Sequence, residues 1–65
     1  MNLYKNKNGE FINLDFFVKI YVIKDVEGDY CIEGMDTHQE TWTIDYFDTE
    51  HKAEVALHDI YHKYS

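Results

Sequence analysis

The sequence contains no arginine and no proline, and it has a single cysteine, Cys31. With one cysteine no intramolecular disulfide can form, which favours a reducing cytoplasm over a secreted setting. Without arginine the chain has no bidentate clamp for phosphate or guanine. No low-complexity or proline-rich stretch divides the 65 residues, so the chain is predicted to form a single domain over residues 1–65.

Long apolar runs and glycine-rich loops are also missing. No stretch approaches the length needed to cross a bilayer, and the start "MNLYKNKNGEF" lacks the apolar segment of a signal peptide. These features predict a cytoplasmic protein with no membrane partner. The three glycines are isolated, so no phosphate-binding loop and no nucleotide cofactor is expected.

Negative charge is abundant and unevenly distributed. The formal net charge is -7, and between Asp25 and Asp59 the only basic residue is Lys52. Such a surface would repel phosphate, so direct nucleic-acid binding is not expected. If the acids formed one stripe, the chain could instead mimic a nucleic acid and inhibit a DNA-binding protein or a nuclease. The acidic surface is predicted at Asp25, Glu27, Asp29, Asp36, Glu40, Asp45 and Asp48.

Turn signals and period-two patterns indicate antiparallel strands. Asn8-Gly9 predicts a type I′ hairpin that pairs Lys7 with Glu10, Lys5 with Ile12 and Leu3 with Leu14. "DVEGD" and "DTHQE" predict two further turns. "TWTIDYF" alternates, with Trp42, Ile44 and Tyr46 expected on one face.

The last segment changes to a helical period. Apolar residues recur at three- and four-residue spacings, which is the pattern of a helix that packs on a sheet. Asp48 or Thr49 is expected to cap its start, and Lys63 to favour its end. The expected buried stripe consists of Ala53, Ala56, Leu57, Ile60, Tyr61 and Tyr64.

Together these patterns predict an α+β fold: a small antiparallel meander of three to four strands with one C-terminal amphipathic helix on one face. One helix cannot cover both faces of the sheet. The strand "FFVKIYVIK", residues 16–24, nevertheless carries large apolar side chains on both of its faces. The face away from the helix is expected to hold Phe17, Tyr21, Ile23 and Met35.

That second apolar face can be explained in three ways. It could pack on a second copy of the chain, it could bind a different protein, or it could be tolerated as scattered apolar surface. A buried contact is favoured because the large side chains adjoin one another. A homodimer with a protein partner is therefore predicted.

The helix also carries histidines at a spacing that can chelate a metal. His58 and His62 lie four residues apart, so their imidazoles share one helix face. A closed site would need further ligands from elsewhere in the chain. The simpler interpretation is a polar helix face in which the histidines interact with the helix dipole, and no metal or other cofactor is predicted.

No pair or triad of residues stands at a spacing typical of catalysis, so the chain is not expected to be an enzyme. The order of the "NG" hairpin, "FINLD", a long apolar strand and the terminal helix "YFDTEHKAEVALHDI" resembles small proteins of unknown role from phages and mobile elements. This resemblance implies a cytoplasmic accessory function. The predicted function is a small acidic protein-binding module that binds or occludes another protein.

Overall fold

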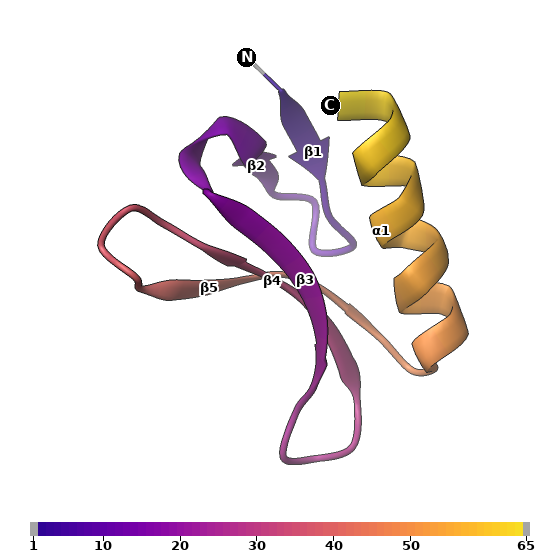
Figure 1. Cartoon of the computed structure of the whole chain (residues 1–65). Helices are drawn as coiled ribbons and strands as arrows, with labels where there is room; N and C mark the ends of the chain where they lie inside the picture. The colour runs from indigo at the N-terminus through magenta and orange to yellow at the C-terminus, as the bar shows by residue number, and fades with distance from the viewer. Residues whose placement is uncertain (1, 65) are drawn as a thin grey trace.

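The computed structural model describes residues 2–64, and the strands and helices follow the order expected for hairpins ahead of a terminal helix. The elements, labelled in Figure 1, are β1 (Leu3–Lys5), β2 (Phe11–Asn13), a short 3-10 helix η1 (Leu14–Phe16), β3 (Lys19–Lys24), β4 (Tyr30–Met35), β5 (Thr41–Phe47) and α1 (Glu50–Tyr64). This is a small α+β fold, and the predicted fold class is confirmed. In the described residues no helix is long and apolar enough to cross a membrane.

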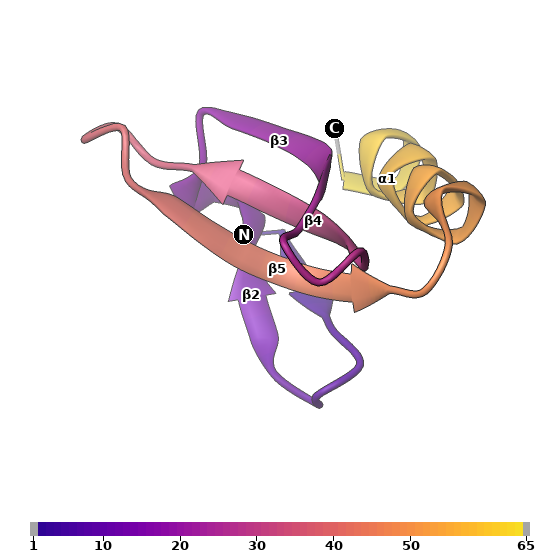
Figure 2. The ribbon, with the colours of Figure 1, turned by 90° about the horizontal axis from the view of Figure 1, so that it is seen from below.

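Two separate sheets form. Strands β3, β4 and β5 make an antiparallel meander in that order, and β1 pairs only with β2. Figure 2 shows the three strands of the meander side by side, with α1 at one end of the view and the β1–β2 hairpin beyond β5. Strand β3 is therefore an edge of the larger sheet.

All three hairpin turns share one design. The side-chain oxygen of the first turn residue accepts backbone N–H groups two and four residues later, at 3.0 and 2.9 Å for Asn6. Asp25 does the same at 2.9 and 2.9 Å, and Asp36 at 2.8 and 3.0 Å. The fourth residue of each turn has a positive φ: 82° at Gly9, 93° at Gly28 and 65° at Gln39. This is a three-residue loop that ends in a left-handed bulge residue.

The first hairpin consequently has a different register from the predicted one. Asn6 begins the turn, so Lys5 pairs with Phe11 and Leu3 pairs with Asn13. The type I′ prediction was wrong because it took Asn8 as a turn centre. The side chain of Asn6, which can accept two backbone donors at once, sets the longer loop instead.

A bulge breaks the expected alternation of β5. The register shifts between Ile32 and Glu33, so β5 has one residue more than the facing part of β4. Ile44 and Asp45 are both buried as a result, while Trp42 and Tyr46 are about half exposed. Tyr46 lies opposite Cys31 and therefore faces away from the core, so the prediction that it shares one face with Trp42 and Ile44 was wrong.

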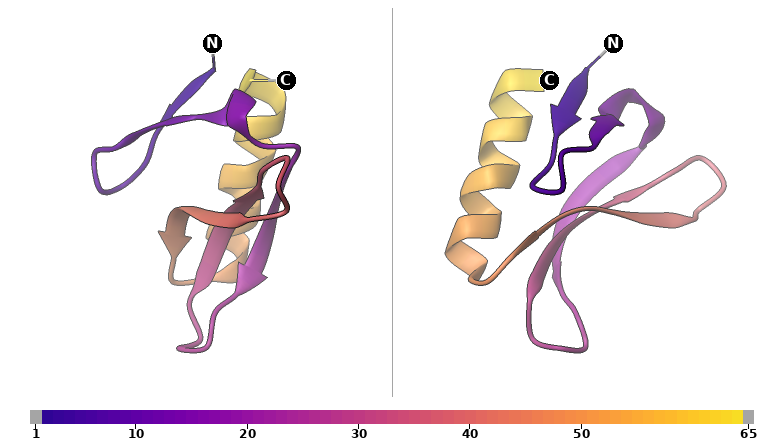
Figure 3. Two further views of the ribbon diagram at one scale, coloured as in Figure 1. Left: turned by 90° about the vertical axis from the view of Figure 1, so that its left-hand side faces the viewer. Right: turned by 180° about the vertical axis from the view of Figure 1, so that it is seen from behind.

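The core lies on one face of the meander, and both α1 and the β1–β2 hairpin cover that face (Figures 1 and 3). Helix residues Ala53 and Ile60 are buried in it, and Ala56 and Leu57 pack against it, as the period predicted. Tyr61 is 67% exposed and departs from the prediction. The side chain of Tyr64 lies outside the described part of the chain. The fully or nearly buried apolar side chains are Leu14, Cys31, Ile32, Ile44, Phe47, Ala53 and Ile60.

The stretch from Phe16 to Lys24 is not one continuous strand. Residues 14–16 form η1, and β3 begins only at Lys19. Phe17 packs on the core face, where its ring lies against Gly34: a Cβ added to that glycine would stand 2.5 Å from the ring. The assignment of Phe17 to the outer face was therefore wrong, because the 3-10 turn rotates this residue toward the core before the strand starts.

Candidate functional site

The outer face of the meander carries most of the apolar residues that were predicted there. The register between β3 and β4 pairs Tyr21 with Glu33, Ile23 with Cys31, and Lys19 with Met35, so these side chains share the face opposite α1. Tyr21, Ile23 and Met35 are each partly exposed. The structure therefore brings together three of the four predicted interface residues.

Polar groups interrupt this outer face. The Tyr21 hydroxyl donates to Glu33 Oε1 at 2.9 Å, and this hydrogen bond is the main reason that the pKa of Tyr21 is raised. Cys31 is buried, and its thiol lies 3.7 Å from Asp25 Oδ2. Burial raises the pKa of the Cys31 thiol, with the Asp25 carboxylate adding to the effect, so the thiol stays protonated at neutral pH.

The acidic residues do not form one stripe. Asp25, Glu27 and Asp29 belong to the β3–β4 turn, whereas Asp36 and Glu40 belong to the β4–β5 turn at the other end of β4. Asp36 and Asp45 were assigned to the acidic surface, but both side chains are buried, at 4% and 3% exposure. Backbone and indole donors hold Asp36 inside its turn, so this assignment is corrected. The nucleic-acid mimic loses the continuous surface on which it depended.

Asp45 is the centre of a polar cluster that fixes the N-terminal hairpin to the β5 side of the core. Its carboxylate accepts the Tyr4 hydroxyl at 2.6 Å, the Lys7 backbone N–H at 3.3 Å and the Tyr46 N–H at 3.0 Å. Asn6 is buried next to it and donates through Nδ2 to the Ile44 carbonyl at 3.0 Å. The bonds from Tyr4, Asn6 and Lys7 join segments 38 to 41 positions apart in the sequence.

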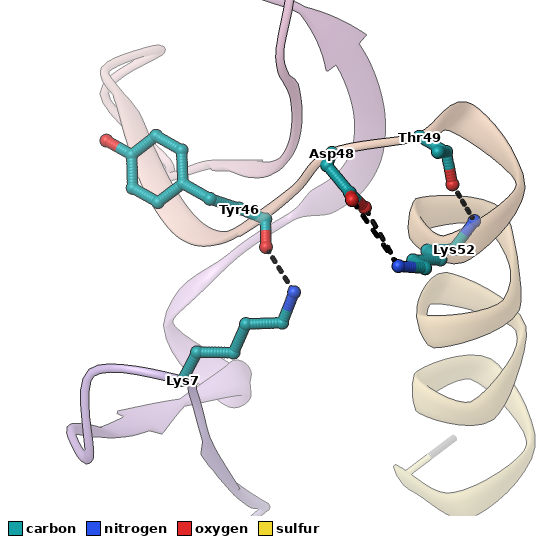
Figure 4. Close-up of polar contacts among 5 residues, drawn as sticks. All are labelled: Lys7, Tyr46, Asp48, Thr49 and Lys52. Carbon is teal, nitrogen blue, oxygen red and sulfur yellow. Dashed lines mark hydrogen bonds and ion pairs between the residues drawn. The ribbon is translucent and has the colours of Figure 1, made fainter.

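Further contacts close the same side at the start of α1. Figure 4 shows the Lys7 ammonium donating to the Tyr46 carbonyl at 2.8 Å, and Lys52 paired with Asp48 at 3.1 Å. Thr49 caps the helix by accepting the Lys52 N–H at 3.2 Å. The Lys52 ammonium lowers the pKa of Asp48 through the hydrogen bond first and the charge second. The β5 side is thus closed by specific polar bonds.

The β3 side of the core is open, which sequence reasoning missed. A groove of about 900 Å³ lies between α1 and the segment that runs from η1 into β3. Its apolar lining includes the core residues Leu14 and Ile60 together with Phe17, Ile20 and Leu57. Glu54, His58 and Lys19 add charged or polar groups around it. The N-terminal hairpin is bonded to β5 and leaves this groove open.

Beside the groove runs the unpaired edge of β3. Hydrogen-bonding direction alternates along an antiparallel strand, and the Asp25 N–H donates to the Asp29 carbonyl at 2.8 Å. The backbone groups of Tyr21 and Ile23 therefore point toward β4. Those of Val22 and Lys24 point away from β4, and within residues 2–64 no strand pairs with them. A meander always leaves its first strand at an edge, and this signal was available in the sequence.

The two histidines considered as metal ligands do lie together. The rings of His58 and His62 are 4.1 Å apart between centroids. Across the described part of the chain, however, no group of three or more potential ligands gathers around them or elsewhere. Two imidazoles on an exposed helix face do not make a closed metal site.

Comparison of the chain with protein-family models, with curated proteins and with solved structures finds no match in any of the three. The resemblance to small phage and mobile-element proteins, and the cytoplasmic location that it implies, stay predictions. The functional argument therefore depends on the geometry of the β3 side and of the outer face.

Proposed function

We propose that this protein is a small protein-binding module that takes up an extended segment along β3. The observation that carries the proposal is the unpaired β3 edge beside an apolar groove. An extended segment that adds to a sheet edge gains main-chain hydrogen bonds, and its alternate side chains gain pockets on either side. Strand β3 has both an edge of unpaired main-chain groups and a neighbouring apolar groove.

The two faces of β3 offer different surroundings to the added segment. On the core face its side chains would enter the groove, where the lining includes Phe17, Ile20 and Leu57. On the outer face they would lie beside Tyr21 and Ile23, the residues expected from the sequence to meet a partner. The apolar character of β3 on both faces is thereby explained by a single binding mode.

Charge adds a preference for the kind of segment. Lys19 and Lys24 begin and end β3, and both are exposed. Lysines on an edge strand discourage indiscriminate strand pairing, and they favour an incoming strand that places carboxylates opposite them. The preferred partner is an extended, largely apolar segment that places a carboxylate opposite at least one of these lysines.

Selection from a library of displayed twelve-residue peptides tests this proposal. The target is the chain itself, and the matched comparison is a chemically synthesised chain in which Val22 carries an N-methyl group. That change removes a donor that points away from β4 and keeps the Val22 side chain. Methylation of Thr43, whose backbone points away from β4 on the opposite edge, is the control.

We expect selected peptides to alternate apolar residues and to shift the Val22 and Lys24 amide signals on binding. N-methylation at Val22 should abolish their binding, whereas N-methylation at Thr43 should leave it intact. Peptides that bind the Val22-methylated chain equally well would contradict strand addition at this edge. A selection that yields no binder at concentrations where the chain is monomeric would contradict it as well.

A further inference from the structure

We infer that β3 pairs with β3 of a second copy of the chain, so that two three-stranded sheets join into one of six strands. This inference rests on the proposed function and names the segment that the β3 edge takes up. The second copy brings an edge of identical shape, with the same outward-pointing backbone groups. Such an interface is isologous and closes after two subunits.

Symmetry restricts the possible registers. A two-fold axis perpendicular to the sheet places the core faces of both subunits on one side of the joined sheet and both outer faces on the other. Residues opposite one another across the interface must therefore belong to the same face. Two registers then pair most of the strand. One places Val22 opposite itself on the axis, and the other places Tyr21 opposite itself.

Charge distinguishes these two registers. With Val22 on the axis, Lys19 lies opposite Asp25 of the partner subunit on the outer face. With Tyr21 on the axis, Lys19 lies opposite Ile23 of the partner subunit and the lysine has no carboxylate across from it. Opposite charges directly across a strand pair are stabilising. The first register is therefore the one that we assign.

The Asp25 carboxylate is oriented suitably for this role. Its Oδ1 accepts the Glu27 and Asp29 N–H groups, each at 2.9 Å, and holds the turn. Within residues 2–64 its Oδ2 accepts only the long hydrogen bond from the Cys31 thiol, at 3.7 Å, and Cys31 lies on the outer face. One oxygen thus shapes the turn while the other is available on the face where Lys19 of the partner subunit would lie.

Exposed apolar residues agree with the same register. Val26 is fully exposed in the single chain, and Val18, which lines the groove, is 63% exposed. The Val22-centred register brings the turn that carries Val26 toward Val18 of the partner subunit. It also places Tyr21 opposite Ile23 of the partner subunit, so that the two outer faces become one larger apolar surface.

Sedimentation equilibrium over a wide concentration range tests the dimer. The wild-type chain, the Val22 N-methyl chain and the Thr43 N-methyl control are compared. We expect the wild type and the control to dimerise equally. The Val22-methylated chain should dimerise on the order of 30-fold more weakly, since two symmetric backbone hydrogen bonds are lost.

Cysteine cross-linking tests the register in a Cys31→Ala background. Val22→Cys should form an intersubunit disulfide rapidly, because its Cα would face its own copy at about 5.5 Å, within the range for a disulfide. Tyr21→Cys should cross-link slowly, because its opposite residue is Ile23 of the partner subunit. Faster cross-linking by Tyr21→Cys would overturn the register.

The ion pair is tested with Asp25→Asn, which keeps an oxygen in the turn, as Asn6 does in the first hairpin. Dimerisation should weaken by about two- to tenfold for two exposed pairs, and the difference should shrink at high salt. A dimer of unchanged affinity would remove the charge argument for the register.

Failure of this inference is distinguishable from failure of the proposed function. A wild-type chain that stays monomeric at high concentration overturns the dimer, while peptide binding at the β3 edge would still support strand addition. A dimer that is unaffected by N-methylation at Val22 overturns the assignment of the interface to β3. The inference is supported if the Val22-methylated chain loses the dimer, the Thr43-methylated control keeps it, and Val22→Cys cross-links rapidly.

Discussion

The two sides of the core differ in how they are closed. On the β5 side, the N-terminal hairpin is joined to the sheet by hydrogen bonds from Tyr4, Asn6 and Lys7. On the β3 side, the strand edge is unpaired and a groove of about 900 Å³ opens between β3 and α1. One side is satisfied within the chain, and the other carries backbone and apolar groups that a partner can satisfy.

The bulge in β5 explains why the hairpin lies where it does. The extra residue turns Asp45 toward the core and leaves the Ile44 carbonyl available to Asn6. A buried carboxylate requires donors, and the hairpin supplies them. Strand β3 pairs regularly with β4, and within residues 2–64 it carries no buried carboxylate that would require donors from the hairpin.

The largest effect is expected from removing the carboxylate that closes the β5 side. Asp45→Ala removes the carboxylate that accepts from the Tyr4 hydroxyl and from two backbone N–H groups. The free energy of unfolding should fall by about 3 kcal/mol. Urea denaturation measures it, with exposed Glu27→Ala as a control expected to change little. Equal stability of the two variants would contradict the importance of the Asp45 cluster.

The next largest effect concerns a tightly packed point near the open side. Gly34→Ala would place a methyl group 2.5 Å from the Phe17 ring. The displacement should cost about 2 kcal/mol of unfolding free energy. Because the clash requires the ring, the double variant with Phe17→Ala should lose less than the sum of the two single changes. Additive losses would mean that the ring is not the obstacle.

An exchange of Asn and Asp in equivalent turns sharpens the comparison. Asn6→Asp keeps the turn acceptor but loses the Nδ2 donor to Ile44, so it should cost about 1.5 kcal/mol of unfolding free energy. Asp25→Asn keeps its turn and should change the free energy by no more than about 0.5 kcal/mol, measured at concentrations where the chain is monomeric. Similar losses in both turns would contradict a difference between the two sides.

The smallest effect is confined to acid solution. The hydrogen bond from Trp42 Nε1 to Asp36 Oδ2, at 3.0 Å, is the main cause that lowers the pKa of Asp36. Since the folded pKa is depressed, the stabilisation is complete above the ordinary value of 3.8 and is lost as the pH falls through the lower folded value. Thermal unfolding followed by Trp42 fluorescence should therefore show a steeper acid decline for the wild type than for Asp36→Asn. Parallel declines would refute the contribution of Asp36.

The sequence predicted elements well where local chemistry determines them. The period of residues 53–60 located the helix stripe, and the turn residues located all three hairpins. The errors arose where a single residue redirects the chain. The Asn6 side chain lengthened the first loop, the bulge turned Asp45 inward, and η1 rotated Phe17 onto the core. The groove depends on where the hairpin packs, which no local pattern encodes.

The most direct test of the open β3 edge is amide hydrogen exchange along β3, measured in dilute and in concentrated solution. In dilute solution the Tyr21 and Ile23 amides should exchange slowly, and the Val22 and Lys24 amides should exchange fast. At higher concentration Val22 and Lys24 should become protected as the edge is covered. Slow exchange of Val22 and Lys24 in dilute solution, or no change with concentration, would contradict an open edge that takes up a second strand.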